Sequence, residues 1–251
     1  MAGHSKWSKV KRVKGAIDVK RGQLFSRLSK EITVAARMGG GDPSGNPRLR
    51  AAVLAARAQS MPNDNIDRAI KRATGDADGA THYEEIVYEG YAPGGVALII
   101  ETATDNKNRT AADLRLIFTK HHGNLASTGS VSYMFKRKGQ ISVPRGAIGE
   151  DPLLAIVLDA GVDELNSDAE HFIITTAPDH LYSVAEALKN AGVPADSQKL
   201  TYLPDTTVPV SDEMVAARIL DLCDALETND DVQGVHANFD LPDDLLARLS
   251  A

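Results

Sequence analysis

The first hydrophobic pattern in the chain predicts one long amphipathic helix over residues 16–38. Arg27, Lys30 and Arg37 fall away from its apolar face, and the glycines at 39–41 end the helix. Five apolar residues recur at spacings of seven, four, four and three, which places them on one helical face. They are Ile17, Leu24, Leu28, Ile32 and Ala35.

Two shorter helices are predicted next, the first capped by Asn46 and broken at residues 61–63, the second ending near residue 74. Two short helices across a tight turn resemble a helix-turn-helix. An ordinary helical hairpin with a solvated charged face gives the same pattern and is the more frequent case. The inward-facing residues are predicted to be Leu49, Val53, Leu54, Ile66, Ile70 and Ala73.

A β-hairpin followed by a helix is predicted twice in the rest of the chain. The first copy covers residues 83–121 and the second residues 162–190. In each copy a turn joins two strands, a helix follows, and a glycine ends the helix. This similarity indicates an internal duplication.

Residues 131–206 contain strands and helices in the order β-α-β-β-α-β, the split β-α-β pattern of ferredoxin-like domains. Residues 79–130 and 207–251 together supply the elements of a second domain of similar build. We therefore expect an α+β fold: an N-terminal three-helix domain, residues 1–78, followed by two ferredoxin-like α/β domains. The domain at 131–206 is expected to be inserted in the discontinuous one, 79–130 plus 207–251.

Basic residues are concentrated at the start of the chain. Residues 1–75 contain 16 Lys and Arg against 5 Asp and Glu, whereas residues 76–251 contain 12 against 29. The net charge of the whole chain is only −6. A basic head on an acidic body indicates that the head meets a polyanion.

Several classes of protein are excluded by composition. No run of about 18 apolar residues occurs, so no transmembrane helix is expected. The single Cys223 excludes an internal disulfide and a cysteine-built metal site, which fits a reducing, cytoplasmic location. No apolar core follows the basic start, as a secretory signal would require, and its richness in lysine disfavours a mitochondrial targeting peptide.

We find no pattern typical of an enzyme. His121 and His122 are adjacent, so on a helix they point about 100° apart and do not form a metal-binding pair. The motifs H-E-x-x-H, G-x-S-x-G and C-x-x-C do not occur. Four acids on or near strands are interpreted as a solvated acidic face, and only a cleft that gathers them would support a hydrolase. They are Glu84, Glu85, Glu89 and Glu101.

The predicted nucleic-acid interface contains three groups of basic residues. In the first, lysines along the N-terminal arm neutralise successive phosphates, and Trp7 either stacks on an unpaired base or anchors the arm on the helices. The second is the exposed face of the third helix, with Asn65. The third is the loop at 105–110, where a helix N-terminus favours an anion, although capping by Asn108 or Thr110 is the simpler explanation. The predicted contacts are His4, Lys6, Trp7, Lys9, Lys11, Arg12, Lys14, Lys20, Arg21, Arg68, Lys71, Arg72, Lys107 and Arg109.

Several motifs spread over nearly the whole chain resemble the YebC family. His122 departs from the family pattern, in which a glycine is usual at this position. The motifs are GHSKW at 3–7, KRG at 20–22, LF at 24–25, NPRLR at 46–50, MPNDNI at 61–66, YEGYAPGG at 88–95, TDNKNRT at 104–110 and GSV at 129–131.

The resemblance implies a helical head and two α/β domains, one inserted in the other, and it supplies no catalytic residues. It also implies one of two functions. Bacterial members are described as probable transcriptional regulators that bind DNA. The mitochondrial relative is a translational activator of cytochrome oxidase subunit synthesis, and ribosome association with relief of stalling has been proposed for bacterial members.

We therefore expect a non-enzymatic, cytoplasmic regulator of gene expression that binds nucleic acid through residues 1–75. Its partner is expected to be DNA or, alternatively, rRNA on the ribosome. No cofactor, membrane or small-molecule substrate is expected, and a monomer is favoured. Charge and motifs alone do not separate the two nucleic-acid partners.

Overall fold

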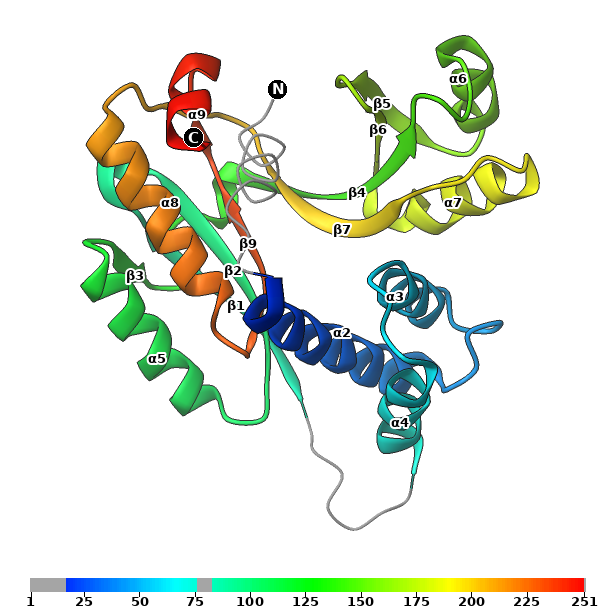
Figure 1. The fold of residues 1–251 in the computed structure, drawn as a ribbon, viewed down its shortest axis with the longest axis horizontal. Helices are drawn as coiled ribbons and strands as arrows, with labels where there is room; N and C mark the ends of the chain where they lie inside the picture. The colour runs from blue at the N-terminus through cyan, green and yellow to red at the C-terminus, as the bar shows by residue number, and fades with distance from the viewer. Residues whose placement is uncertain (1–16, 76–82, 251) are drawn as a thin grey trace. The chain divides into compact units, whose positions relative to one another are not determined.

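A computed structural model describes residues 17–75 and 83–250 of the chain (Figure 1). Three helices come first, namely α2 (Ile17–Gly39), α3 (Pro47–Ala58) and α4 (Asn63–Thr74), and two four-stranded sheets with their own helices follow. This arrangement confirms the predicted α+β class.

The chain divides into two compact units. The first comprises the described residues of Met1–Ala56, Met61–Lys136 and Leu203–Ala251, and the second comprises Arg57–Ser60 and Arg137–Tyr202. The helical bundle and the first sheet therefore belong to one unit. The division into three domains stays a prediction.

The three N-terminal helices share one apolar core. Ile32 of α2 and Leu49 of α3 have no exposed surface, and Ile66 of α4 is 2% exposed. The main helix partner of α4 is α2. The prediction that Leu54 faces inward is wrong, because 53% of it is exposed and Ala52 lies in the core instead.

Asn46 begins α3, as predicted. Its side-chain oxygen accepts a hydrogen bond of 3.1 Å from the backbone N–H of Leu49. Its amide nitrogen donates to the carbonyl oxygens of Ala35 and Gly40, each at 2.8 Å. One buried side chain therefore closes the end of α2 and the start of α3.

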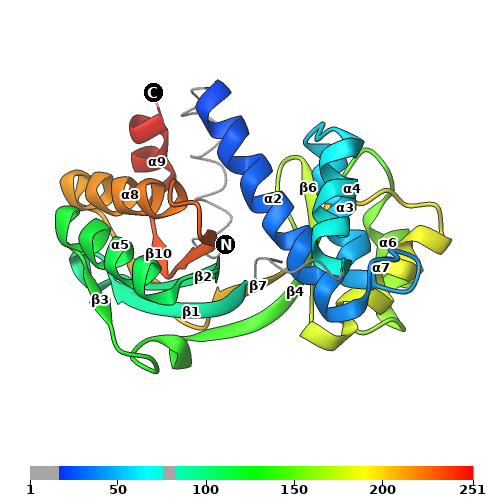
Figure 2. The ribbon, with the colours of Figure 1, turned by 90° about the horizontal axis from the view of Figure 1, so that it is seen from below.

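The first sheet has the strand order β3-β1-β2-β9, and all its neighbouring strands are antiparallel. Helices α5 (Lys107–Lys120) and α8 (Glu213–Glu227) cover one of its faces (Figure 2). Leu98 and Ile100 point from β2 into the core with Leu114 and Phe118 of α5. The strands are β1 (Glu84–Tyr91), β2 (Ala97–Thr104), β3 (Asn124–Ala126) and β9 (Val232–Ala237).

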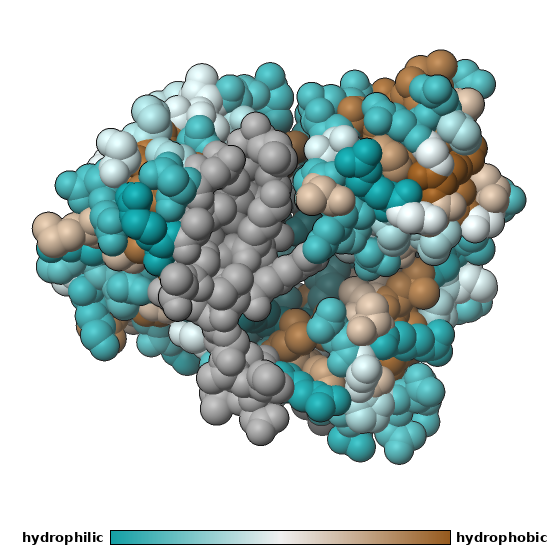
Figure 3. Space-filling view, turned by 45° about the horizontal axis from the view of Figure 1, so that its top comes forward, coloured by the Kyte–Doolittle hydropathy of each residue, from teal (hydrophilic) through white to brown (hydrophobic). Residues whose placement is uncertain are grey.

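The second sheet has the order β5-β6-β4-β7, which is the ferredoxin-like arrangement predicted for this part of the chain. Helices α6 (Glu150–Leu158) and α7 (Leu181–Asn190) supply the apolar residues that pack on it. Figure 3 shows apolar side chains at the upper right, the side on which Figure 1 places α6. The strands are β4 (Phe135–Pro144), β5 (Val162–Ser167), β6 (His171–Thr176) and β7 (Ser197–Pro204).

Both predicted hairpin-and-helix units are present, as β1-β2-α5 and as β5-β6-α7. They enter their sheets differently. In the first sheet the hairpin precedes both helices, whereas in the second β4 and α6 come before it. The two sheets thus have a similar layout with different chain connectivity.

A few short elements were not predicted. Strand β10 (Phe239–Asp240) follows β9 and pairs in parallel with β8 (Val208–Pro209). A last helix, α9 (Asp243–Ser250), follows. Three 3-10 turns also occur, namely η1 (Pro93–Gly95), η2 (Ser132–Met134) and η3 (Pro178–His180).

The end of α5 explains the departure at His122. This residue has a φ of +60°, in the left-handed region, and the next backbone N–H, of Gly123, donates to the carbonyl oxygen of Phe118 at 2.8 Å. A left-handed residue at a helix end is usually glycine, because a side chain there costs roughly 1–2 kcal/mol. The glycine that the resemblance to the YebC family implies at this position would avoid that cost.

Candidate nucleic-acid interface

The exposed face of α4 carries three cations. Arg68, Lys71 and Arg72 are spaced by three and one residues, so they lie together on the side of the helix opposite the buried Ile66 and Ala69. All three are exposed, and none forms an ion pair with another described residue. This face is therefore open to a phosphate-bearing partner.

Two acids accompany these cations on α4. Asp64 and Asp67 are also exposed and precede Arg68 and Lys71 by four residues each. The helix therefore presents three positive and two negative side chains, so its net charge is modest. The acids offer a matched set of control positions on the same surface.

The basic side chains of α2 behave differently. Gln23, Arg27 and Lys30 follow one another at spacings of four and three, on one side of α2. Gln23 donates to the carbonyl oxygen of Thr228 at 3.2 Å, and Arg27 donates to that of Glu227. These carbonyls lie at the C-terminal end of α8, where backbone oxygens lack helical partners and the helix dipole is negative.

Lys30 completes this contact between α2 and the first sheet. Its Nζ donates to Oδ1 of Asp231 at 2.7 Å and to the carbonyl oxygen of Asp230 at 2.8 Å. The side chain of Lys30 is only 11% exposed. Arg27 and Lys30 lie off the apolar face of α2, as predicted, but they meet a second part of the protein there. Helix α2 thus uses two faces, an apolar one toward α3 and α4 and a polar one toward α8 and β9.

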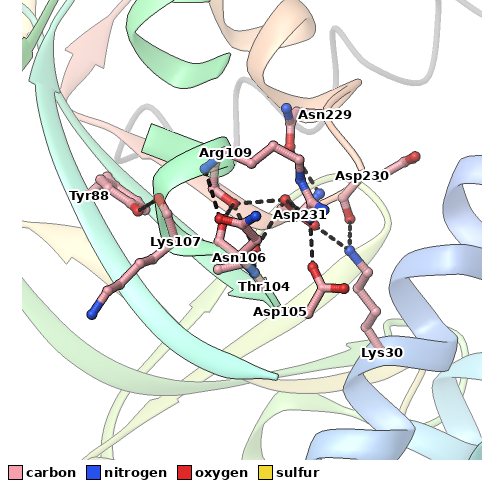
Figure 4. Close-up of polar contacts among 11 residues, drawn as sticks. Lys30, Tyr88, Thr104, Asp105, Asn106, Lys107, Arg109, Asn229, Asp230 and Asp231 are labelled. Atoms are coloured by element: carbon pink, nitrogen blue, oxygen red, sulfur yellow. Dashed lines mark hydrogen bonds and ion pairs between the residues drawn. The ribbon is translucent and has the colours of Figure 1, made fainter. Parts of the chain in front are cut away.

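Asp231 is the centre of the contact (Figure 4). Its Oδ2 accepts hydrogen bonds from Nη2 of Arg109 at 2.8 Å, from the hydroxyl of Thr110 at 2.8 Å and from that of Thr104 at 3.3 Å. Asp231 is only 4% exposed. A buried carboxylate therefore joins α2, the β2–α5 loop and the start of β9.

The pKa of Asp231 reflects these partners. Burial by itself raises the pKa, but the hydrogen bonds from Lys30, Arg109 and Thr110 outweigh it. The result is a pKa of about 2, below the ordinary 3.8. Asp231 is therefore charged at neutral pH and holds both cations by charge-assisted hydrogen bonds.

The loop at 105–110 is shaped by this network. Asn106 caps α5 by accepting from the backbone N–H of Arg109 at 3.1 Å, so the predicted cap at Asn108 or Thr110 is wrong. Arg109 also donates to Asp105 at 2.8 Å, and 47% of its side chain remains exposed. Lys107 is exposed, and its carbonyl accepts from the hydroxyl of Tyr88 at 3.3 Å (Figure 4). Of the two predicted phosphate contacts here, Arg109 is thus held by the protein's own carboxylates.

A small open pocket of about 370 Å³ lies beside this network. Its charged lining contains four carboxylates and two cations that already pair with carboxylates, so it does not favour an anionic ligand. The lining residues are Ser26, Lys30, Tyr83, Asp105, Arg109, Asp113, Asn229, Asp230 and Asp231.

A second ion-pair cluster links α2, α3 and β1. Arg48 donates from Nε to Glu31 at 2.8 Å and from Nη2 to Glu85 at 2.6 Å, with a second bond to each carboxylate at 3.1 Å. Burial by itself lowers the pKa of Arg48, but the hydrogen bonds that it donates to Glu85 and Glu31 raise it above its ordinary value. This arginine is therefore also committed within the chain.

The prediction of a solvated acidic face is wrong for Glu89, which is 3% exposed. Its carboxylate accepts backbone N–H bonds from Gly129 at 2.7 Å, Val131 at 2.6 Å and Ser132 at 3.0 Å. Burial raises the pKa of Glu89, but these bonds bring it below its usual value. Glu89 thus fastens the segment at 129–132 to β1.

Glu101 is likewise paired rather than freely solvated. Its Oε2 lies 2.7 Å from Nε2 of His236 on the neighbouring strand.

In the described residues we find no three His, Cys, Asp or Glu side chains placed to hold one metal ion. None of the helices seen there is long and apolar enough to span a membrane.

Most of the predicted N-terminal contacts lie outside the described residues: His4, Lys6, Trp7, Lys9, Lys11, Arg12 and Lys14. Lys20 belongs to the first turn of α2, where only the backbone is described. Arg21 is exposed, and its guanidinium lies 5.5 Å from the centre of the Phe25 ring. The structure therefore places Arg21, Arg68, Lys71, Arg72 and Lys107 on the surface and gives Arg109 two internal partners.

Sequence reasoning did not predict the internal ion pairs of Lys30 with Asp231 and of Arg48 with two glutamates. The spacing of Gln23, Arg27 and Lys30 did contain a signal, since it marks a second stripe on α2. Asp231, however, is 201 residues away from Lys30 in the sequence. No local pattern relates the two.

Comparison with known proteins agrees with this architecture. Residues 5–76 match the family model described as the TACO1/YebC protein N-terminal domain, and residues 83–239 match the model of the TACO1/YebC second and third domain. A crystal structure of a conserved hypothetical protein from Aquifex aeolicus has a TM-score of 0.81 and 47% identity to the chain. The match covers 90% of this chain and 92% of that one.

Relatives of the same length are more similar still. A probable transcriptional regulatory protein of Chlorobaculum tepidum is 56% identical over 99% of both chains. One from Rubrobacter xylanophilus, with the same description, is 51% identical over 100% of both chains. By these matches along its whole length, the chain belongs to the TACO1/YebC family.

Proposed function

We propose that this chain is a non-enzymatic, YebC-type regulator of gene expression that binds nucleic acid through α4 and the basic N-terminal segment. The observation that carries the proposal is the exposed group of Arg68, Lys71 and Arg72, which has no ion pair among the described residues. The names of the relatives, probable transcriptional regulatory proteins, support duplex DNA as the first candidate ligand.

The chemistry of this surface suits phosphates. Arginine and lysine on one helix face can each neutralise a phosphate and release a counterion. Such contacts position a protein on nucleic acid, whereas sequence is read by side chains that reach base edges. The strong positive charge of residues 1–75, 16 Lys and Arg against 5 Asp and Glu, adds long-range attraction to the same partner.

The first test changes the charge of α4. In R68A/K71A/R72A, we expect the slope of log affinity against log salt for duplex DNA to fall by up to about 2.7, because about 0.9 is lost for each phosphate contact. The matched control D64N/D67N removes acids from the same surface and should strengthen binding. Unchanged salt slopes in both variants would remove α4 from the interface.

The second test concerns the arm. In K9A/K11A/R12A/K14A, the salt slope should fall by up to about 3.6, four contacts at about 0.9 each. Fluorescence anisotropy with a labelled duplex at several salt concentrations measures this. A full effect in this variant and none in the α4 variant would confine binding to the arm.

Structured RNA of the ribosome is the second candidate. The lysine and arginine side chains on α4 can bind the phosphates of either nucleic acid. The observation that favours the ribosome is the acidic charge of residues 76–251, which could contact basic ribosomal proteins. Equal affinity for promoter and random duplex at physiological salt would count against transcriptional control. Absence from ribosomal fractions of gently lysed cells would count against the translational alternative.

The inserted sheet does not add an RNA-binding surface of the stacking type. On β4 and β6, Ile141 and Ile174 belong to the core side, while Gln140, Ser142 and Ile173 point to the other side. RNA-recognition sheets of similar topology use aromatic side chains at such positions. We therefore assign the nucleic-acid contact to the helical part of the chain.

A further inference from the structure

Helix α6 in the second unit has an unusual composition for its position. Residues 152–158, PLLAIVL, are apolar on every side of the helix. A helix that packs on a sheet needs only one apolar face, and an apolar helix without a polar side is normally surrounded by protein. Helix α7, which packs on the same sheet, follows the usual rule and exposes polar residues such as Lys189 and Asn190.

The outer side of α6 is exposed. Leu153 and Val157 are completely buried against the sheet, whereas Leu158 is 62% exposed and Leu154 is 40% exposed. Pro152 and Ala155 of the same helix are also exposed. The two leucines are four residues apart, so they form one apolar strip along the outside of the helix.

Carboxylates surround this strip. Glu150 and Asp151 precede it in the first turn of α6, and Asp159 caps the other end. Glu164 is exposed on β5, the edge strand that follows, and Asp163 beside it accepts a hydrogen bond of 2.7 Å from Nζ of Lys138. Residues 150–164 contain these five acids and no lysine or arginine.

We infer that the outer face of α6 docks a cationic amphipathic segment of a partner protein. The apolar side of such a segment covers Leu154 and Leu158, and its lysines or arginines meet the surrounding carboxylates. Charge complementarity selects this occupant: a nucleic acid would be repelled by the four acids other than Asp163, and a second copy of the face would bring like charges together. This surface consists of other residues than the proposed nucleic-acid interface, and the inference does not depend on the proposed nucleic-acid binding.

The test uses the full chain and a synthetic helical peptide of leucine and lysine at amphipathic spacing, with a twin in which glutamine replaces lysine. We expect the lysine peptide to bind, and the glutamine twin to bind at least tenfold more weakly. In L154S/L158S the affinity for the lysine peptide should fall at least tenfold. The matched control is L116S, which removes a leucine that is 68% exposed on α5, beside Arg115.

Each outcome decides the proposal. Lower affinity in L154S/L158S with no change in L116S supports the proposal. A tenfold loss in D151N/D159N/E164Q, whose fold is checked by circular dichroism, supports it as well. Absence of binding to the unchanged chain, equal losses in both leucine variants, or equal binding of the twin overturns it. A dimer in sedimentation that L154S/L158S abolishes would assign the face to a second copy and also overturns it.

Discussion

Helices α2 and α4 both carry basic residues, but two of those on α2 are bound within the protein, whereas all three on α4 are exposed. Arg27 and Lys30 of α2 bind the carbonyls at the end of α8 and the buried Asp231. Lys71 and Arg72 of α4 have no ion pair among the described residues and are exposed. The positive charge of a segment therefore overstates the charge that it can offer to nucleic acid.

The difference has a simple cause. Helix α2 lies between the helical core and the first sheet, so both of its long faces meet other parts of the chain. Helix α4 packs mainly on α2 and keeps one face without a protein neighbour in the described structure. The same residue types act as internal anchors in one helix and as surface cations in the other.

The largest effect is expected from removal of the anchor. Asp231→Ala leaves Lys30, 11% exposed, without its carboxylate, and breaking a buried pair typically costs about 3–5 kcal/mol. Urea unfolding followed by circular dichroism measures the loss. Asp105→Ala removes a partner of Arg109 that is 42% exposed, so it should cost less than about 1 kcal/mol. Similar losses in the two variants would mean that Asp231 is not the anchor.

The next effect is a dependence on pH. The pKa of Asp231 in the folded protein, about 2, is lower than its ordinary 3.8, so its charged form stabilises the fold. This stability is complete above about pH 5 and is lost as the pH falls toward 2, a total of about 2 kcal/mol. The unfolding free energies of the natural chain and of Asp231→Asn should therefore converge with falling pH. Parallel curves between pH 6 and pH 2.5 would contradict the assignment.

A pair of single lysine variants tests the comparison directly. Lys30→Gln should lower the free energy of unfolding by about 1–3 kcal/mol, because Asp231 loses a charge-assisted hydrogen bond, and should leave the salt slope of DNA binding unchanged. Lys71→Gln should do the reverse, with a slope lower by about 0.9 and a stability change below about 0.5 kcal/mol. If both variants changed the salt slope equally, the distinction between α2 and α4 would fail.

The smallest effect is expected at Arg48 of α3. Arg48→Lys keeps the charge but loses the paired hydrogen bonds to Glu31 and Glu85. Because 29% of this arginine is exposed, we expect a loss of less than about 1 kcal/mol, which high salt reduces further. A loss above about 3 kcal/mol would place Arg48 with Asp231 as an anchor.

Local patterns were good guides where neighbours along the chain decide the structure. The cap at Asn46, the buried side of α4 and the ferredoxin-like order of the second sheet follow from short-range spacing and element order. Leu54 was misplaced because Ala52 and Ala56 allow α3 to pack closely on that side, and small residues give little periodic signal. Glu89 was misplaced because its three backbone donors lie about 40 residues away.

Residue order alone was enough to predict the three N-terminal helices, the two hairpin units, the concentration of positive charge in residues 1–75 and the family motifs. These features depend on residue type and on spacing over a few neighbouring residues of one helix or strand. Which cations are already neutralised became clear only from the folded chain, because Lys30 and Asp231 are 201 residues apart in the sequence. Electrostatic partners are set by distance in space, and that distance is fixed by how the apolar faces pack.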